Sequence, residues 1–371
     1  MNQPSASPDE AQSEQHDQPV PQSLLRRIVS CLKWPAAVSL ITWLGYQNRE
    51  QFERLLSGEQ EIHWEFLAAA FALCMSSIVL TFFRWYLLVV ALDFPFQFRD
   101  ALRLGFLGCL FNYVAPGAVG GDAIKAVVLA NEQTSRRAVA VATILLDRIL
   151  GLLALLMVGA GAALVVPTDI EHRAKIVAVL WGGASAGLVG LMIMLSPAAR
   201  SRPVLALTKL PKVGGIFADL LDAVTLYQSR RGVVILAVLI SVVAHFGVIS
   251  SFYLCALAVA AQQIVPDYAT HLFLIPLAEI IGVITPVPAG LGALEGAVQE
   301  SYRLAGATPE IGFLAAGAYR ATSLVIAIAG AGFYVLQKKR IAALLASDPD
   351  RLGNDASADE TSYHDDPATT A

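Results

Sequence analysis

The chain has little charge for its length. Only 15% of its 371 residues are Asp, Glu, Lys or Arg, whereas 56% are hydrophobic. A soluble domain carries about 25% charged residues, so this composition excludes an ordinary water-soluble enzyme. Lys and Arg are also missing from the first 23 residues, which hold four acids, and residues 348–371 hold seven acids and one Arg. These acidic ends have too little apolar surface to fold, and we predict disordered tails at 1–23 and 346–371.

The motifs of several enzyme classes are missing as well. The four cysteines lie singly in apolar stretches, without a CxxC pair or metal-ligand spacing, so we predict no metal and no cofactor. No GxxxxGK[ST] loop for ATP is present, and no cleavable signal peptide precedes the first apolar run. The acid pairs Asp122 with Glu132 and Glu295 with Glu300 lack a DxD-like or His-rich companion. We therefore do not expect an enzyme, nor a nucleic-acid partner.

What remains is a basic and strongly apolar core. Residues 24–347 contain 25 Lys and Arg against 19 Asp and Glu, as expected of a membrane protein whose loops touch anionic lipid. A bilayer core about 30 Å thick needs roughly 20 apolar residues in a helix. The sequence therefore predicts an all-α integral membrane protein with a polytopic domain at 24–345. Six segments are long enough to span: Ile28–Gln47, Trp64–Leu92, Ala138–Val166, Ile176–Leu195, Gly232–Ala261 and Ile311–Leu336.

Two further apolar stretches are short and broken by Pro and Gly. Ala101–Ala115 runs into a turn at 116–122, and His271–Thr285 runs into a turn at 286–292. A second short limb follows each turn, which indicates a re-entrant hairpin rather than a span. The turns contain Pro116, Gly117, Gly120, Gly121, Pro286, Pro288, Gly290 and Gly292.

Loop charges predict the orientation, because Lys and Arg concentrate in cytoplasmic loops. Basic residues at 26–33, 99–103, 136–137 and 200–231 place both termini in the cytoplasm. The first hairpin then enters from the cytoplasm and the second from outside. In the loop 196–231 an apolar stripe at helical spacing predicts a helix along the headgroup layer. The stripe consists of Ile216, Phe217, Leu220, Leu221, Val224 and Tyr227.

An offset of 172 residues relates the two hairpins. It aligns Pro116 with Pro288, Gly120 with Gly292, and Arg148 with Arg320. Because three spans separate the hairpins, we expect the halves 28–166 and 176–336 to form an inverted repeat. Many secondary transporters build a substrate site where the broken helices of such repeats meet.

Arg148 and Arg320 lie deep in apolar helices, roughly 15 Å from a helix end. An unpaired charge there costs at least about 2.5 kcal/mol, so each arginine needs a partner or a wet cavity. The arginines either link helices through carboxylates or converge with helix N-termini as a phosphate site. The acids that could pair with them are Asp122, Asp147, Glu279, Glu295 and Glu300.

Three other polar residues lie in or near apolar helices. We expect Arg84 to extend toward the membrane surface, and Lys125 either to do the same or to bind an anionic headgroup. His245 has no second His or Cys at ligand spacing. It is therefore predicted to be a hydrogen-bonded core residue rather than a proton relay or a metal ligand.

The stretch Asn-Tyr-Val-Ala-Pro at 112–116, Gly-Gly-Asp at 120–122 with Lys125, and Asp147-Arg148 resembles the first signature of the lysylphosphatidylglycerol synthase transmembrane-region family, also called flippase-like. The turn that ends in Gly-Leu-Gly-x-x-Glu at 290–295, followed by Tyr319-Arg320, resembles its second signature. The resemblance covers about residues 25–340. The family often has Glu-Arg where this chain has Asp147-Arg148, which keeps the charge on a shorter arm.

The resemblance implies a multi-pass protein of the bacterial inner membrane that binds and translocates an anionic phospholipid or a polyprenyl- or hopanoid-type lipid. Lipid aminoacylation is not expected of this chain, because no stretch remains for the soluble aminoacyl-transferase half of the best-understood members. The alternatives are an accessory subunit of a lipid-modifying enzyme, or a membrane enzyme acting on a lipid or lipid-linked glycan. The residues expected to bind substrate are Arg148, Arg320, Asp122, Lys125, Asp147, Glu295, Asn112 and Tyr319.

Overall fold

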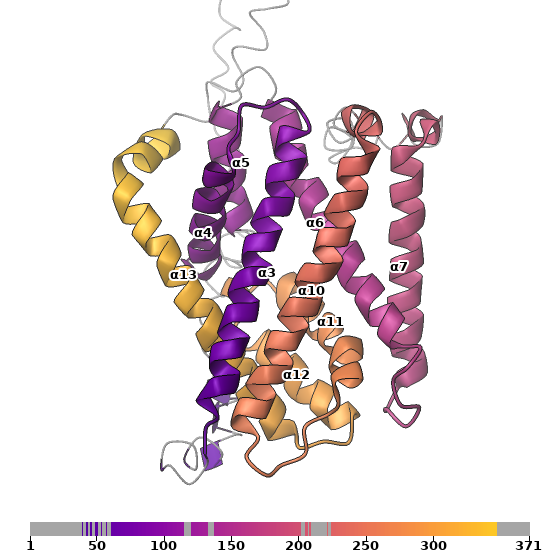
Figure 1. Cartoon of the computed structure of the whole chain (residues 1–371), viewed down its shortest axis with the longest axis vertical. Coiled ribbons are helices and arrows are strands. Elements are labelled where there is room, and N and C mark those ends of the chain that lie inside the picture. The colour runs from indigo at the N-terminus through magenta and orange to yellow at the C-terminus, as the bar shows by residue number, and fades with distance from the viewer. Residues whose placement is uncertain are drawn as a thin grey trace, which may run out of the picture.

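The computed structural model describes residues 61–114, 120–132, 137–201 and 224–346, together with isolated positions before and between these ranges. Within them the chain folds into helices and contains no strand. In chain order (Figure 1) the helices are α3 (Trp64–Val90), α4 (Phe98–Val114), α5 (Gly120–Glu132), α6 (Arg137–Ala162), α7 (Arg173–Leu195), η2 (Pro197–Arg200), α10 (Arg231–Val259), α11 (Tyr268–Ile284), η3 (Pro288–Gly290), α12 (Ala293–Leu304) and α13 (Pro309–Ala346).

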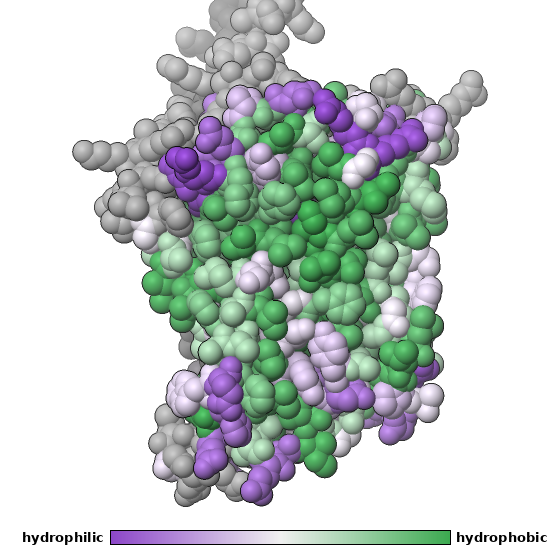
Figure 2. Space-filling view, in the orientation of Figure 1, coloured by the Kyte–Doolittle hydropathy of each residue, from purple (hydrophilic) through white to green (hydrophobic). Residues whose placement is uncertain are grey.

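Five of the described helices, α3, α6, α7, α10 and α13, are long and apolar enough to cross a bilayer. They coincide with five of the predicted spans, which confirms the all-α membrane fold. Figure 2 shows apolar side chains in a broad band around the middle, with polar side chains at both ends. Apolar residues such as Val179 of α7 and Leu239 of α10 are exposed, because contact with lipid carries no hydrophobic penalty. The predicted span Ile28–Gln47 and both predicted tails lie outside the described ranges.

The Pro- and Gly-containing breaks divide each short apolar stretch into two packed helices. α4 packs against α5, and α11 packs against α12. The α4–α5 pair lies toward one end of the bundle and the α11–α12 pair toward the opposite end (Figure 1). The sequence therefore located both breaks and the short limbs on either side of them.

The second break is a turn with left-handed backbone conformation. Ala289, Gly290 and Gly292 have φ angles of 50°, 65° and 79°. Positive φ angles carry a steric energy penalty for every residue except glycine. A Cβ atom on Gly290 would also collide with the carbonyl oxygen of Gly282 on α11. The turn can approach α11 closely because glycine occupies this position. Pro116 and Gly117 of the first break lie outside the described residues.

The long helices α3 and α10 pack together along the centre of the bundle. The Ser251 hydroxyl on α10 donates to the carbonyl oxygen of Ala70 on α3 at 2.9 Å. Two apolar clusters include residues of this pair, with Trp85 and Leu150 in the first and Phe252 in the second. A third cluster, which contains Leu180, joins α6, α7 and α11. The core therefore extends through both predicted halves.

The end of the loop 196–231 is part of the bundle. Val224 and Tyr227, the last members of the predicted headgroup stripe, are buried. The Tyr227 hydroxyl donates to the carbonyl oxygen of Leu88 at 2.8 Å. Tyr227 therefore contacts α3, and residues 211–220 of the stripe lie outside the described ranges.

The contact between α4 and α5 makes a testable prediction about Gly121. A Cβ atom there would collide with the backbone oxygen of Gly108, whereas a Cβ atom on Gly182 of α7 would meet nothing. We expect Gly121→Ala to destabilise the protein by about 1–3 kcal/mol, because the two backbones must separate. Gly182→Ala is the matched control, and it should leave the thermal-unfolding temperature of the purified protein unchanged or raise it. Equal unfolding temperatures for the two variants would contradict the close approach.

Candidate functional site

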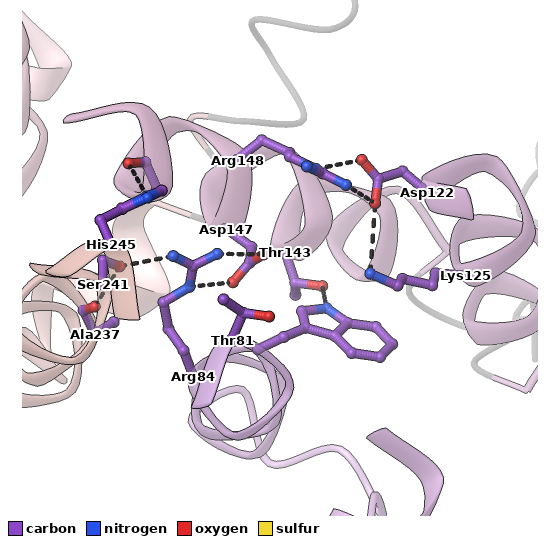
Figure 3. A network of polar contacts seen from close by, with 12 residues as sticks. Thr81, Arg84, Asp122, Lys125, Thr143, Asp147, Arg148, Ala237, Ser241 and His245 are labelled. Carbon is purple, nitrogen blue, oxygen red and sulfur yellow. Dashed lines mark hydrogen bonds and ion pairs between the residues drawn. The ribbon is translucent and has the colours of Figure 1, made fainter. Parts of the chain in front are cut away.

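Asp122, Lys125 and Arg148 form a charged cluster between α5 and α6 (Figure 3). Arg148 donates to both carboxylate oxygens of Asp122, through Nε and, at 2.8 Å, through Nη2. The ammonium of Lys125 lies 3.5 Å from the same carboxylate, because residues three apart share one face of α5. Two cations therefore share one anion, and the cluster carries a net charge of +1.

The two cations of this cluster differ in exposure. The Lys125 side chain is 13% exposed, and its ammonium lies 5.4 Å from the centre of the Trp85 ring. The expectation that Lys125 extends toward the membrane surface is therefore wrong, because Asp122 and the Trp85 ring hold it inside. The Arg148 side chain is 48% exposed. It lies eleven residues from the start of α6, or about 16 Å along the helix.

Glu295 and Arg320 form the corresponding pair in the second half. Arg320 Nε donates to Glu295 Oε1 at 2.7 Å, and Nη1 donates to the carbonyl oxygen of Ala289 at 2.7 Å. Glu295 Oε2 also accepts from the backbone nitrogen of Gly292 at 2.7 Å. The Arg320 side chain is only 15% exposed. Arg320 thus holds the strained turn in place and neutralises the acid that caps α12.

The two pairs occupy equivalent places in the predicted repeat. Each joins an acid near the start of the second hairpin limb to an arginine in the following long helix. The acid precedes the arginine by 26 residues in one half and by 25 in the other. A backbone N–H at the start of each second limb donates to a side-chain oxygen. Gly121 donates to the Asn112 side chain at 2.9 Å, and Gly292 donates to Glu295. This correspondence supports the repeat and assigns Asp122 and Glu295 as the partners that the sequence left open.

Asp147 belongs to a different pair. Arg84 of α3 donates to both Asp147 carboxylate oxygens, at 2.7 and 2.8 Å, and to the Ser241 hydroxyl of α10 at 2.7 Å (Figure 3). Both residues are buried, so the expectation that Arg84 extends toward the surface is wrong. Consecutive helix residues point about 100° apart, which directs Asp147 inward and Arg148 outward.

The remaining candidates contact neither Arg148 nor the Asp122 carboxylate. Tyr319 stacks on Phe252 with ring centroids 3.8 Å apart. His245 bonds the carbonyl oxygen of Gly151 at 3.0 Å, as predicted for a hydrogen-bonded core histidine. Glu300 pairs with the exposed Arg303 rather than with either intramembrane arginine.

The structure therefore separates the candidates into two groups, one in each half. Asp122, Lys125 and Arg148 lie together, and Glu295 and Arg320 lie together. In the part of the chain that the structure describes, no contact joins the two arginines. The described residues also contain no group of three His, Cys, Asp or Glu side chains that could hold a metal ion.

The buried Arg84–Asp147 pair is expected to contribute strongly to stability. Asp147→Asn leaves the Arg84 charge buried without its counter-ion, which costs about 3–5 kcal/mol. The thermal-unfolding temperature of the purified protein should fall sharply. Glu300→Gln is the matched control, because it removes one carboxylate from an exposed pair whose attraction is screened by solvent. A similar small effect of both substitutions would show that the Arg84–Asp147 pair is dispensable.

Searches against curated proteins and against solved structures find no match to this chain. A comparison with family models finds one that covers residues 27–330, including α3 to α12, most of α13 and all the paired charges described above. The match spans well over half of the chain. The chain therefore belongs to the family described as the lysylphosphatidylglycerol synthase TM region.

Proposed function

We propose that the protein binds the phosphate of an anionic lipid headgroup at the Asp122–Lys125–Arg148 cluster and moves that headgroup across the bacterial inner membrane. The observation that carries this proposal is the net charge of +1 on the cluster together with the half-exposed Arg148 side chain. The pairs Arg84–Asp147 and Arg320–Glu295 are each neutral and largely buried. Of these three charged groups, only the Asp122–Lys125–Arg148 cluster combines surplus positive charge with access from the protein surface.

The guanidinium of Arg148 suits a lipid phosphate. Its planar fork can present two parallel donors to phosphate oxygens, and Lys125 adds a point charge beside it. Asp122 has a separate part. It orients the Arg148 side chain through two bonds and lowers the cost of its charge in the apolar helix while no lipid is bound.

The surface around Arg148 suits acyl chains. Val141, Leu145, Ile149 and Leu152 of α6 are exposed apolar residues at helical spacing, so they form a stripe on the face where Arg148 emerges. A lipid whose phosphate binds Arg148 can lay its chains along this stripe without leaving the bilayer. A soluble anion gains nothing from the stripe, which favours a lipid over a free phosphate compound.

The unequal exposure of the equivalent arginines supports movement as well as binding. Arg148 is 48% exposed and Arg320 is 15% exposed, although the predicted repeat aligns them. In inverted-repeat transporters the two halves exchange conformations, and this exchange opens the site to the other side. We propose that the described state has the first hairpin open, on the cytoplasmic side according to the loop charges. In the opposite state Arg320 becomes the accessible arginine.

The binding step can be tested with Arg148→Gln. Loss of a charge-assisted contact with phosphate costs about 1.5–3 kcal/mol, or about 10- to 100-fold in affinity. Native mass spectrometry of gently purified protein should show an anionic lipid bound to the wild type and lost from the variant. Arg303→Gln is the matched control, because Arg303 is also a carboxylate-paired arginine with a 46% exposed side chain, but it lies outside the cluster. It should retain the lipid.

The transport step needs a separate measurement. The protein is reconstituted into phosphatidylcholine vesicles that contain fluorescent phosphatidylglycerol, and the fraction of reporter reached by an impermeant quencher is followed with time. We expect faster movement with the wild type and with Arg303→Gln than with Arg148→Gln or with empty vesicles. Equal rates for Arg148→Gln and the wild type, in equally stable protein, would refute the assigned site.

A further inference from the structure

A histidine and a glutamate face each other in the interior of the bundle. His245 lies at the midpoint of α10, fourteen residues from either end. Glu279 lies on α11, eleven residues after the helix begins. The distance from His245 Nδ1 to Glu279 Oε2 is 3.7 Å, and both side chains are largely buried. Neither residue belongs to the lipid site proposed above.

The contacts of the imidazole determine where its hydrogen lies. His245 Nε2 is 3.0 Å from the carbonyl oxygen of Gly151. A carbonyl oxygen can only accept, so Nε2 carries the hydrogen. His245 Nδ1 is buried and has no hydrogen-bond partner. This nitrogen, directed at the Glu279 carboxyl group, is therefore the position on the ring where a proton can be gained or lost.

The favoured state of the pair holds one proton. Without a proton on the pair, the Nδ1 lone pair faces a buried carboxylate that has no cation to neutralise it. With two protons on the pair, a buried imidazolium lies beside a neutral carboxylic acid. With one, either an imidazolium pairs with a carboxylate or a carboxylic acid donates to Nδ1, and both arrangements leave the pair neutral. One proton thus removes the cost of a buried charge.

Among the described residues, no neighbouring charged group replaces the shared proton as the counter-ion of Glu279. The ionisable groups around the pair are Arg84 of α3, which acts on His245, and Cys74 of α3 and Tyr319 of α13, which lie near Glu279. Asp147 of α6 bonds Arg84. Arg84 is neutralised by its two bonds to Asp147, so it does not replace the proton as counter-ion for Glu279. Cys74 and Tyr319 are neutral groups at ordinary pH. Protonation at this position therefore depends on the burial of the pair and on the 3.7 Å separation of His245 and Glu279.

That separation depends on how α11 packs against α10 and α6. His245 bonds α6 through Gly151, three residues after Arg148, whereas Glu279 belongs to the second hairpin. α11 packs against both α6 and α10. Any displacement of this hairpin against α6 moves the carboxyl group relative to the imidazole. A displacement that separates the two groups and admits water to the Glu279 carboxyl group removes both the shared contact and the burial that favour the proton, so it lowers the affinity for the proton.

We propose that His245 and Glu279 form a proton-binding site that couples the state of the second hairpin to proton uptake and release. Binding adds one proton from water to Nδ1 or to a Glu279 oxygen, release returns it to water, and no other bond changes. This inference rests on the proposed lipid movement, for which it supplies the driving ion. A proton gradient would then bias the direction in which headgroups move.

The proton site can be tested without transport. Nitrogen-15 NMR of histidine-labelled protein in phosphatidylcholine nanodiscs follows the His245 ring with pH, and His245→Asn identifies its signal. We expect Glu279→Gln to lower the midpoint of this titration by about one pH unit or more, because the carboxylate no longer stabilises the imidazolium. Glu65→Gln is the control, since Glu65 lies 3.3 Å from His63 in an exposed pair. An unchanged His245 midpoint in Glu279→Gln would overturn the shared-proton site.

Coupling is tested with the vesicle assay and an imposed pH gradient. Movement of fluorescent phosphatidylglycerol by the wild type, Glu65→Gln and His63→Gln should respond to the sign of the gradient. Glu279→Gln and His245→Gln should lose that response, with thermal unfolding confirming that they fold. Wild-type movement that ignores the gradient overturns the coupling and leaves the lipid function standing. No movement by the wild type under any gradient overturns both.

Discussion

Neutralisation of arginine inside an apolar bundle is the constraint on which the rest of the structure depends. An isolated charge near the bilayer centre is costly, and each of the three deep arginines has a carboxylate partner. The pairs Arg84–Asp147, Arg148–Asp122 and Arg320–Glu295 join α3 to α6, α5 to α6, and α12 to α13. Because each pair connects different helices, satisfying the charges also determines how the hairpins attach to the long helices. Charge pairing therefore positions the broken segments.

The same chemical pairing has different consequences in the two halves. Around Arg320 the guanidinium bonds a carboxylate and a turn carbonyl and is mostly covered. Around Arg148 a second cation shares the single carboxylate, and the guanidinium reaches an apolar surface. A closed pair has nothing left for a ligand, whereas an open pair with surplus charge does. This difference in exposure and charge is the basis of the lipid site proposed at the first hairpin.

A second layer of polar groups lies behind these pairs. Arg84 contacts both Asp147 and Ser241, and its guanidinium lies against Gly151, the residue whose carbonyl oxygen bonds His245. The His245–Glu279 pair extends this layer to the second hairpin. A continuous set of polar contacts thus runs from α3 through α6 and α10 to α11. Such a set gives the two halves a physical means of influencing each other.

The sequence alone determined the membrane class, five described spans and the position of both breaks, because span length and Pro and Gly act locally along the chain. It also identified Arg148 and Arg320 as exceptional, since a charge in a long apolar run is visible without coordinates. The partners were decided only by the tertiary structure. Asp147 neighbours Arg148 in sequence but pairs with Arg84, 63 residues away. Glu279 of α11 faces His245 of α10. Helix rotation and packing select which side chains meet, and no local pattern encodes that choice.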